Sequence, residues 1–468
     1  MHQISLDIDS LVTFRNSQGR HGRGTLIHIT RTSAVFEVYN PYSIVQLSEV
    51  LPNLCILRGE REIYKGSAVV SNILTTGIMI IVSVSLIDPW SDLSQLRPGG
   101  AVKNETIRFI RDWTESYNIR PDYQLIVGTI RNFLGELSRW LKEAEAEAGI
   151  QYDHRNTGDL ADDFYNEVQS PLEPKFLELF SCFEEQAGNI PVEESMAHKA
   201  FARRALHPYI LCSPFVHRAY TKPLGYAGDY EIVNMMLQES KTQTLDVYAR
   251  VIDSFHINSS APEAHRNRIN MIYEHLTSEA KRVIEDEERF FNVLNVGCGP
   301  AVEIQKFIAT MPLSTQAAFD LMDFNEATID FLEHRINNLI RESGNKPYIK
   351  FIHKSIDILL KEANRNIGRT SGKYDLVYCA GLFDYFSDQI CRRLTALFFS
   401  WIRPGGSVIV TNVDPGNPNR FQMEHLLEWN LEYRNEQDMK KLVPDGAQYT
   451  IKKDTTGINI FLFLKKTD

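Results

Sequence analysis

The segment Phe291-Asn-Val-Leu-Asn-Val-Gly-Cys-Gly-Pro300 constrains the fold more than any other part of the chain. An apolar run of strand length breaks at two glycines, and a helical pattern follows from Ala301 to Thr310. Because glycine lacks Cβ, Gly297 and Gly299 permit a sharp strand-to-helix turn whose backbone N–H groups lie against a ligand. The segment therefore predicts a nucleotide-like cofactor site at the C-terminal edge of an α/β sheet.

The next apolar run, 317–322, ends in Asp323. A carboxylate at the end of a second strand can accept hydrogen bonds from both hydroxyls of a ribose. A dinucleotide fingerprint needs Gly or Ala at the position of Val302, where a bulky residue disfavours close packing of a pyrophosphate. Ala301 fits the shorter glycine pattern of S-adenosylmethionine methyltransferases, whose ligand has no phosphate. The alternative is an ordinary α/β turn with a surface aspartate.

The C-terminal part alternates between strand and helix patterns. The expected strands are 374–379, 407–413, 448–453 and 458–464, and the expected helices are 388–402 and 422–441. The turn residues 403–406 end the first of these helices, and 454–457 join the last two strands into a hairpin. A parallel sheet closed by an antiparallel hairpin resembles the Rossmann-like core of class I methyltransferases.

That resemblance implies a set of contacts with S-adenosylmethionine. The glycine turn flanks the methionine end, Asp323 holds the ribose, the segment after the third strand touches the adenine, and the end of the fourth strand faces the sulfonium. The implied cofactor-binding residues are Gly297, Cys298, Gly299, Ala301, Asp323, Phe324, Ser355, Ile356, Cys379 and Ala380.

Composition limits what surrounds this core. A chain of 468 residues exceeds what one hydrophobic core usually supports, so we expect two or three units. A net charge of −10 disfavours nucleic acid and anionic membrane as partners. The N-terminus lacks the pattern of a secretory signal, and the longest apolar stretch, 73–87, is too short to span a membrane, so we expect a cytoplasmic protein. Six scattered cysteines without a C-x-x-C pair indicate neither disulfides nor a metal site.

The first 96 residues predict a small β-barrel. The runs 24–38, 62–73 and 77–87 are strand-like and rich in β-branched residues. Their pattern resembles PilZ domains, which bind cyclic di-GMP through an arginine pair and a D/N-x-S-x-x-G motif. The corresponding positions of the motif hold His28, Thr30 and Ser33, and Arg20 and Arg23 lack the spacing of the arginine pair. An alternative is that the three arginines Arg15, Arg20 and Arg23 together bind a phosphate. We therefore expect a structural or interaction module that does not bind cyclic di-GMP tightly.

The middle region, 97–285, is mainly helical in pattern and is expected to include an acceptor-binding cover, 222–269, and the core occupies 286–468. The expected helices are 106–117, 124–148 and 161–186, and 149–159 is a polar linker. Long amphipathic helices outside a catalytic core often mediate dimerisation, so a homodimer remains open.

Several strings are distinctive, and they occur across nearly the whole chain. They are 222–230 (KPLGYAGDY), 264–269 (AHRNRI), 378–386 (YCAGLFDYF), 411–418 (TNVDPGNP) and 424–429 (EHLLEW). Together they resemble the bacterial 3-hydroxypalmitic acid methyl ester biosynthesis proteins. The resemblance implies a methyltransferase that makes a fatty acyl methyl ester, a quorum-sensing molecule.

Methylation of a carboxylate needs positioning more than proton transfer, because the nucleophile is already ionised near neutral pH. Arg266 and Arg268 are candidates to clamp the carboxylate of a small hydrophobic acid, with Tyr226 and Tyr385 as neutral donors. The alternative is that both arginines are surface or ion-paired helix residues and that Tyr226 is a packing residue.

Asp384 discriminates between acceptors, since an ionised carboxylate attracts an amine but repels an acid. Two further hypotheses stay open. One is methylation of an amine or another small acceptor. The other is a regulatory protein in which the PilZ-like module and a cofactor-binding domain sense ligands without turnover.

Overall fold

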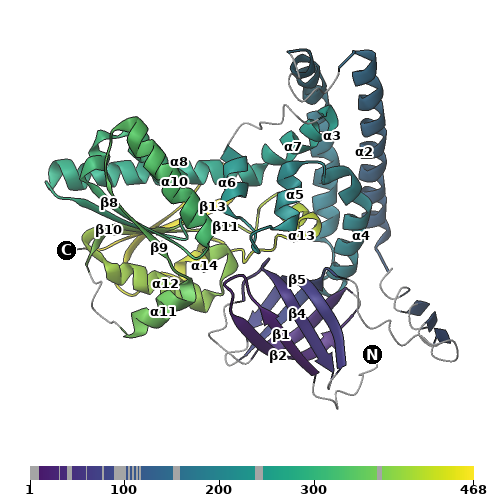
Figure 1. Cartoon of the computed structure of the whole chain (residues 1–468), viewed down its shortest axis with the longest axis horizontal. Helices are drawn as coiled ribbons and strands as arrows, with labels where there is room; N and C mark the ends of the chain where they lie inside the picture. Colours follow the sequence, from purple (N-terminus) through teal and green to yellow (C-terminus); the bar gives the residue numbers. More distant parts are fainter. Residues whose placement is uncertain are drawn as a thin grey trace.

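The computed structural model describes most of the chain. The described residues are 10–30, 32–38, 45–58, 61–75, 79–88, 118–150, 159–237, 246–365 and 372–467, with short pieces at 102–103, 106–107, 110–111 and 114. They form an N-terminal β-barrel, a helical region and a helix-covered sheet (Figure 1). The expected helix 106–117 and the linker 149–159 lie largely outside the described residues.

The N-terminal part is a closed barrel with strand order β1-β2-β3-β6-β5-β4. Its strands are β1 (Ser10–Arg15), β2 (His21–Ile29), β3 (Ser33–Val38), β4 (Val50–Arg58), β5 (Arg61–Thr75) and β6 (Ile80–Leu86). Alternate residues such as Val12, Phe14 and Phe36 fill the interior, as the period of a half-buried strand requires. The predicted barrel is confirmed, although β1 and β4 were not expected.

The expected strand 24–38 is two strands. The Thr30 hydroxyl accepts a hydrogen bond from the Ser33 backbone N–H at 3.0 Å, and the Thr30 N–H donates to the Ser33 carbonyl at 2.8 Å. A threonine that bonds to backbone this close along the chain favours a turn over a continuous strand. The run therefore folds back on itself as a hairpin.

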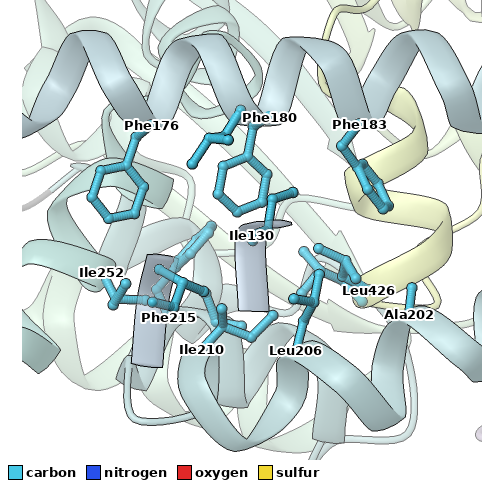
Figure 2. Packing of buried hydrophobic residues seen from close by; sticks show 14 of the residues in the cluster. Ile130, Phe176, Phe180, Phe183, Ala202, Leu206, Ile210, Phe215, Ile252 and Leu426 are labelled. Atoms are coloured by element: carbon cyan, nitrogen blue, oxygen red, sulfur yellow. The ribbon is translucent and has the colours of Figure 1, made fainter. Parts of the chain in front are cut away.

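The middle region is a group of packed helices. They are α2 (Pro121–Glu147), α3 (Asp159–Gly188), α4 (Val192–Ile210), α5 (Pro214–Thr221), α6 (Tyr230–Leu237), α7 (Val247–Ile257) and α8 (Ser260–Lys281), with a π-helical turn η2 (Arg282–Asp286) after α8. Figure 2 shows Phe176, Phe180 and Phe183 of α3 facing the apolar side of α4. Leu426 lies in the same cluster, although it comes from α13 (Arg420–Leu426) near the C-terminus.

The C-terminal part contains a seven-stranded sheet with the order β12-β13-β11-β10-β7-β8-β9. Its strands are β7 (Phe291–Val296), β8 (Ala317–Asp323), β9 (Tyr348–His353), β10 (Tyr374–Cys379), β11 (Ile402–Val413), β12 (Gln448–Lys453) and β13 (Asn459–Lys465). The strands β9, β8, β7, β10 and β11 are parallel neighbours, whereas β13 is antiparallel to both β11 and β12. The predicted parallel sheet with a closing hairpin is confirmed.

Helices cover both faces of this sheet (Figure 1). They are α9 (Val302–Thr310), α10 (Glu326–Ser343), α11 (Ile356–Arg365), α12 (Asp388–Trp401) and α14 (Glu436–Lys440), with 3₁₀ turns η3 (Pro312–Gln316) and η4 (Phe383–Tyr385). The four central strands β7, β8, β10 and β11 are largely apolar, as expected of strands buried on both faces. Within the described residues, no helix combines the length and apolarity that crossing a membrane requires.

Two expectations for the C-terminal part are wrong. Residues 403–406 do not form a turn that precedes the strand. They lie inside β11, where the register of pairing with β10 shifts between Tyr374 and Leu376. The run 422–441 is not one helix, because α13 ends at Leu426 and α14 begins at Glu436. Glu428 has a left-handed backbone (φ 50°), which a continuous helix does not allow.

Arg434 fixes the non-helical segment between α13 and α14. Its guanidinium donates to the carbonyls of Phe383 (2.9 Å) and Phe386 (2.6 Å) and to Asn412 Oδ1 (2.7 Å), and only 2% of the side chain is exposed. These bonds attach the segment to the loop that follows β10. The loop therefore has a fixed position although it contains only one short 3₁₀ turn.

Replacement of Arg434 by Ala leaves these buried acceptors unpaired, and we expect the free energy of unfolding to fall by about 3 kcal/mol. Urea unfolding followed by circular dichroism measures this change. Arg341→Ala, on the exposed face of α10, is the matched control and should change it by less than about 0.5 kcal/mol. Equal effects of the two substitutions would contradict the role given to Arg434.

Candidate functional site

The glycine turn after β7 has the backbone that the sequence predicts. Gly297 (φ 67°), Gly299 (φ 50°) and Ala301 (φ 46°) all adopt left-handed conformations. A Cβ on Gly299 would meet no heavy atom within 4 Å, so this part of the turn borders open space. The turn thus provides a concave backbone surface at the end of β7, where ligands bind in open α/β sheets.

The backbone N–H groups of this turn have protein partners, which the sequence analysis did not anticipate. The N–H groups of Gly297 and Cys298 both donate to the Met322 carbonyl, at 2.8 and 3.0 Å. The Gly299 N–H donates to Asp323 Oδ2 at 3.0 Å. The turn is therefore held against the end of β8, and it presents space rather than free N–H groups to a ligand.

Asp323 lies at the end of β8 with 6% of its surface exposed. Its carboxylate accepts hydrogen bonds from the N–H groups of Gly299 and Asn325, both at 3.0 Å. Burial raises the pKa of Asp323, and these backbone hydrogen bonds oppose the rise. Each carboxylate oxygen has a second lone pair, so Asp323 can also accept from the hydroxyl groups of a ligand.

Asp323 borders a cavity of about 90 Å³, called here the small cavity. Met322, Phe324, Ile356 and Leu382 give it apolar walls. Tyr226 lies across from Phe324, with ring centroids 4.9 Å apart, and its hydroxyl is 3.4 Å from that of Thr328. Three barrel residues, Gln18, Gln46 and Leu47, also line this cavity.

A second cavity, of about 190 Å³, borders the other side of the turn and is called here the large cavity. Both cavities are lined by Gly297, Gly299, Ala380 and Gly381, so they meet at the ends of β7 and β10. The helical region and the segment after α13 supply most of its apolar lining. These apolar residues include Phe215, Ile232, Val233, Met236, Ile269, Ile272, Met423, Leu427, Trp429 and Leu431.

Arg268 of α8 brings a positive charge into this apolar cavity. Its guanidinium lies beside Gly381, where a Cβ would come within 2.9 Å of the guanidinium nitrogens. Arg268 Nη2 donates to His265 Nδ1 at 2.7 Å, and among the described residues Arg268 forms no ion pair. Burial lowers the pKa of Arg268, while Asp384 opposes this shift. A buried arginine still carries its charge, so this side chain can bind an anion.

His265 is neutral in this arrangement. Burial, together with the charges of Arg268 and Arg266, holds the pKa of His265 well below its usual value. Because Nδ1 accepts from Arg268, the proton of the neutral ring resides on Nε2.

Asp384 and Tyr385 lie in the loop after β10, on the same cavity wall. Asp384 Oδ1 accepts from the Val413 N–H at 2.8 Å. Burial raises the pKa of Asp384 to about 6, although Arg268 and Arg434 counteract the rise. The Tyr385 hydroxyl accepts from Trp429 Nε1 at 2.9 Å and donates to the Ala227 carbonyl at 3.3 Å.

Most of the predicted site residues line one or both cavities. They are Tyr226, Arg268, Gly297, Cys298, Gly299, Ala301, Asp323, Phe324, Ile356, Ala380 and Tyr385. Cys379 and Ser355 lie outside the two linings: Cys379 is fully buried in the core beneath α12, and the Ser355 hydroxyl accepts from the Ile358 N–H at 3.4 Å.

The structure gives Arg266 a different position from that expected of a carboxylate clamp. Its Nη1 donates to the carbonyls of Met236 and Ile257, both at 3.0 Å, and it does not line either cavity. A side chain two positions along a helix points about 200° away. Since Arg268 faces the large cavity, Arg266 instead joins α8 to α6 and α7.

The barrel residues of the small cavity were not predicted from the sequence. No motif marks Gln18, Gln46 or Leu47, because their proximity to Asp323 arises only from packing between distant parts of the chain. Within the described residues, no group of three or more His, Cys, Asp or Glu side chains could hold a metal ion.

Comparisons with known proteins give distant matches. No protein-family model matches the chain. The chain is 24% identical over 182 residues to malonyl-[acyl-carrier protein] O-methyltransferase 2 of Ilyobacter polytropus, a match over 37% of this chain and 61% of that protein. A second O-methyltransferase of the same organism matches at 24% identity over 38% of this chain and 58% of its own length. The chain thus matches about three fifths of the length of these relatives.

Solved structures also give distant matches, which cover more of both chains. Magnesium protoporphyrin IX methyltransferase from Synechocystis matches with a TM-score of 0.30 and 14% identity, over 44% of this chain and 82% of that one. A "possible exported protein" of Bordetella parapertussis matches with a TM-score of 0.40 and 15% identity, over 65% of this chain and 99% of that one. The O-methyltransferase sequence matches, together with the strand order and the glycine turn, support a Rossmann-like class I methyltransferase core.

Proposed function

We propose that the protein is an S-adenosylmethionine-dependent methyltransferase that methylates the carboxylate of a hydrophobic acid, with 3-hydroxy fatty acids as the first candidates. One observation carries the choice of acceptor. Arg268 is a buried cation without a carboxylate partner among the described residues, inside an apolar cavity that meets the small cavity at the glycine turn. A buried charge of this kind favours an anionic ligand, because pairing offsets its desolvation.

The small cavity fits the cofactor. Asp323 can accept from ribose hydroxyls, Phe324, Ile356 and Leu382 offer apolar surfaces to an adenine ring, and the open space over Gly299 accommodates the methionine portion. S-adenosylmethionine supplies an electrophilic methyl group. Gly297, Gly299 and Ala380, which line both cavities, would border its sulfonium.

The chain's own residues then have to orient the acceptor and exclude water. Arg268 binds the carboxylate and sets its direction through charge-assisted hydrogen bonds. The apolar walls take the acyl chain and keep water out. No side chain has to remove a proton, because the carboxylate is ionised near neutral pH. Arg268 is therefore the residue whose loss should be most specific for acid acceptors.

Asp384 favours a second acceptor class, an amine. Its carboxylate lies in the wall of the large cavity and is ionised above about pH 6. An ionised Asp384 would attract an ammonium group and repel an acid. Incubation with labelled S-adenosylmethionine and a pooled library of acids and amines, followed by mass spectrometry, distinguishes the two classes. The absence of any methylated product would instead favour a ligand-sensing protein.

Asp323→Ala should weaken binding of S-adenosylhomocysteine by about 10- to 150-fold, the scale of one lost charge-assisted hydrogen bond. Isothermal titration calorimetry measures the affinity, and circular dichroism verifies the fold. Asp330→Ala, at an exposed position of α10, is the control. Unchanged affinity in a folded Asp323→Ala variant would exclude Asp323 from the cofactor site.

Arg268→Ala should lower kcat/KM for acid acceptors by about 10- to 150-fold and leave the affinity for S-adenosylhomocysteine nearly unchanged. Arg268→Lys retains the charge but loses the planar fork, so its kcat/KM should lie between those of the wild type and the Ala variant. Steady-state kinetics and calorimetry separate the two effects. Full acid turnover in Arg268→Ala would refute the carboxylate-binding role.

Asp384→Asn should change the pH profile of acid methylation. In the wild type, ionisation of Asp384 as the pH rises through about 6 places a second negative charge near the acceptor, so kcat/KM for acids should fall over this range. The Asn variant keeps an acceptor for the Val413 N–H but lacks the charge. We expect about a 10-fold gain for acids at pH 7.5, the equivalent of one pKa unit. A loss for amines and no gain for acids would favour the amine hypothesis.

A further inference from the structure

The N-terminal barrel takes part in the small cavity through the turn between β1 and β2. Gln18 lies at the tip of this turn and lines the cavity together with Asp323 and Phe324. The Gln18 side-chain oxygen is buried and has no hydrogen-bond partner in the described structure. Buried polar atoms are almost always paired, so an orphan oxygen at a cavity wall indicates a partner from a ligand.

The turn that carries Gln18 is held in one conformation. Asn16 Oδ1 accepts from the N–H groups of Gln18 (3.1 Å) and Arg20 (2.8 Å), and the Arg20 carbonyl accepts from the Asn16 N–H at 2.9 Å. Gly19 has φ 75°, a conformation that glycine adopts without strain. The Ser17 N–H donates to Glu49 Oε1 at 2.7 Å, which attaches the turn to the start of β4. The backbone of Gln18 is thus held in place.

The same turn is fastened to the methyltransferase core. Arg20 forms an ion pair with Asp357, which follows the cavity residue Ile356 at the start of α11. Elsewhere, the Val50 N–H donates to the Gly225 carbonyl at 2.7 Å. The Ser48 hydroxyl donates to the Asn430 carbonyl at 3.0 Å. These contacts fix the barrel relative to the cofactor cavity.

The chemistry of the cavity indicates a role for the Gln18 amide. The apolar side chains cover the faces of a flat ring, and Asp323 is suited to ribose hydroxyls. Lys354, another polar residue of the lining, is paired with Glu362 at 2.7 Å. An adenine edge presents an amino donor beside a ring-nitrogen acceptor, and a glutamine amide offers the complementary acceptor and donor.

We propose that Gln18 of the N-terminal barrel binds the amino-bearing edge of the cofactor's adenine, so that the barrel forms part of the cofactor site. This inference rests on the proposed S-adenosylmethionine cofactor. It assigns the barrel a binding role in the methyltransferase site that does not depend on a cyclic dinucleotide.

The test pairs a protein change with a ligand change, so that the interaction between the two is measured directly. The full-length protein is titrated calorimetrically with S-adenosylhomocysteine and with its 6-deamino analogue, in which hydrogen replaces the adenine amino group. The wild type should bind S-adenosylhomocysteine about 10-fold more tightly than the analogue, the scale of one hydrogen bond. Gln18→Ala should bind S-adenosylhomocysteine about 10-fold more weakly than the wild type does. It should prefer S-adenosylhomocysteine over the analogue by no more than about 2-fold.

Two further variants complete the design. Gln18→Glu keeps an oxygen that accepts from the amino group, so it should retain the preference for S-adenosylhomocysteine over the analogue. His21→Ala, at an exposed position of the same hairpin outside both cavities, should behave like the wild type. If the role of Gln18 were merely structural, Gln18→Ala would lose affinity for both ligands by the same factor. It would then keep the wild-type preference for S-adenosylhomocysteine over the analogue.

The possible failures are distinguishable. If the wild type binds S-adenosylhomocysteine and Gln18→Ala keeps both its affinity and its preference for the amino group, the role of Gln18 is refuted and the proposed function stands. If the folded wild type does not bind S-adenosylhomocysteine, both proposals are refuted. Loss of the amino-group preference in Gln18→Ala but not in Gln18→Glu is the result that the inference requires.

Discussion

The segment between β11 and β12 holds the three parts of the molecule together. Its helix α13 places Leu426 in the helical core, and the N–H groups of Phe421 and Gln422 donate to Glu184 of α3. Asn430 bonds with Ser48 of the barrel, and Arg434 binds the carbonyls of the loop after β10. Because both cavities lie between these parts, their shapes depend on this segment. Its backbone is irregular because it contacts three different parts of the molecule.

The large cavity is lined by one buried arginine, Arg268, and by two buried carboxyl groups, those of Asp384 and Glu303. Arg268 is buried without an ion pair among the described residues, and Asp384 nearby is buried with its pKa raised to about 6. The cost of burying a charge is normally offset by a partner at close range. Here Arg268 instead donates to a neutral histidine, so its guanidinium retains the capacity to bind an anion. In the proposed function, the balance between Arg268 and the carboxyl groups of Asp384 and Glu303 would decide between acid and amine acceptors.

Local sequence patterns predicted the sheet, the glycine turn and Asp323, because each depends on residues within a few positions. They failed where distant contacts override periodicity. The run 422–441 has helical spacing, yet Arg434 is drawn into a buried network that a continuous helix could not reach. Arg266 and Arg268 are equivalent in a motif, and only the packing of α8 shows that one reaches a cavity while the other binds backbone carbonyls. No local sequence pattern marks the barrel residues that line the small cavity.

The contact between barrel and core also has a thermodynamic consequence. If Gln18 binds the cofactor, then any change that loosens the barrel must weaken cofactor binding, and cofactor binding must tighten the barrel's docking by the same free energy. The ion pair between Arg20 and Asp357 joins the barrel to the core beside the small cavity. Arg20 follows Gln18 by two residues, and Asp357 directly follows Ile356 of the cavity wall. Arg20, one of the three arginines considered for binding a cyclic dinucleotide, is therefore already paired with a carboxylate of the core. If Gln18 binds the cofactor, a ligand that competed for Arg20 would therefore lower the affinity for the cofactor.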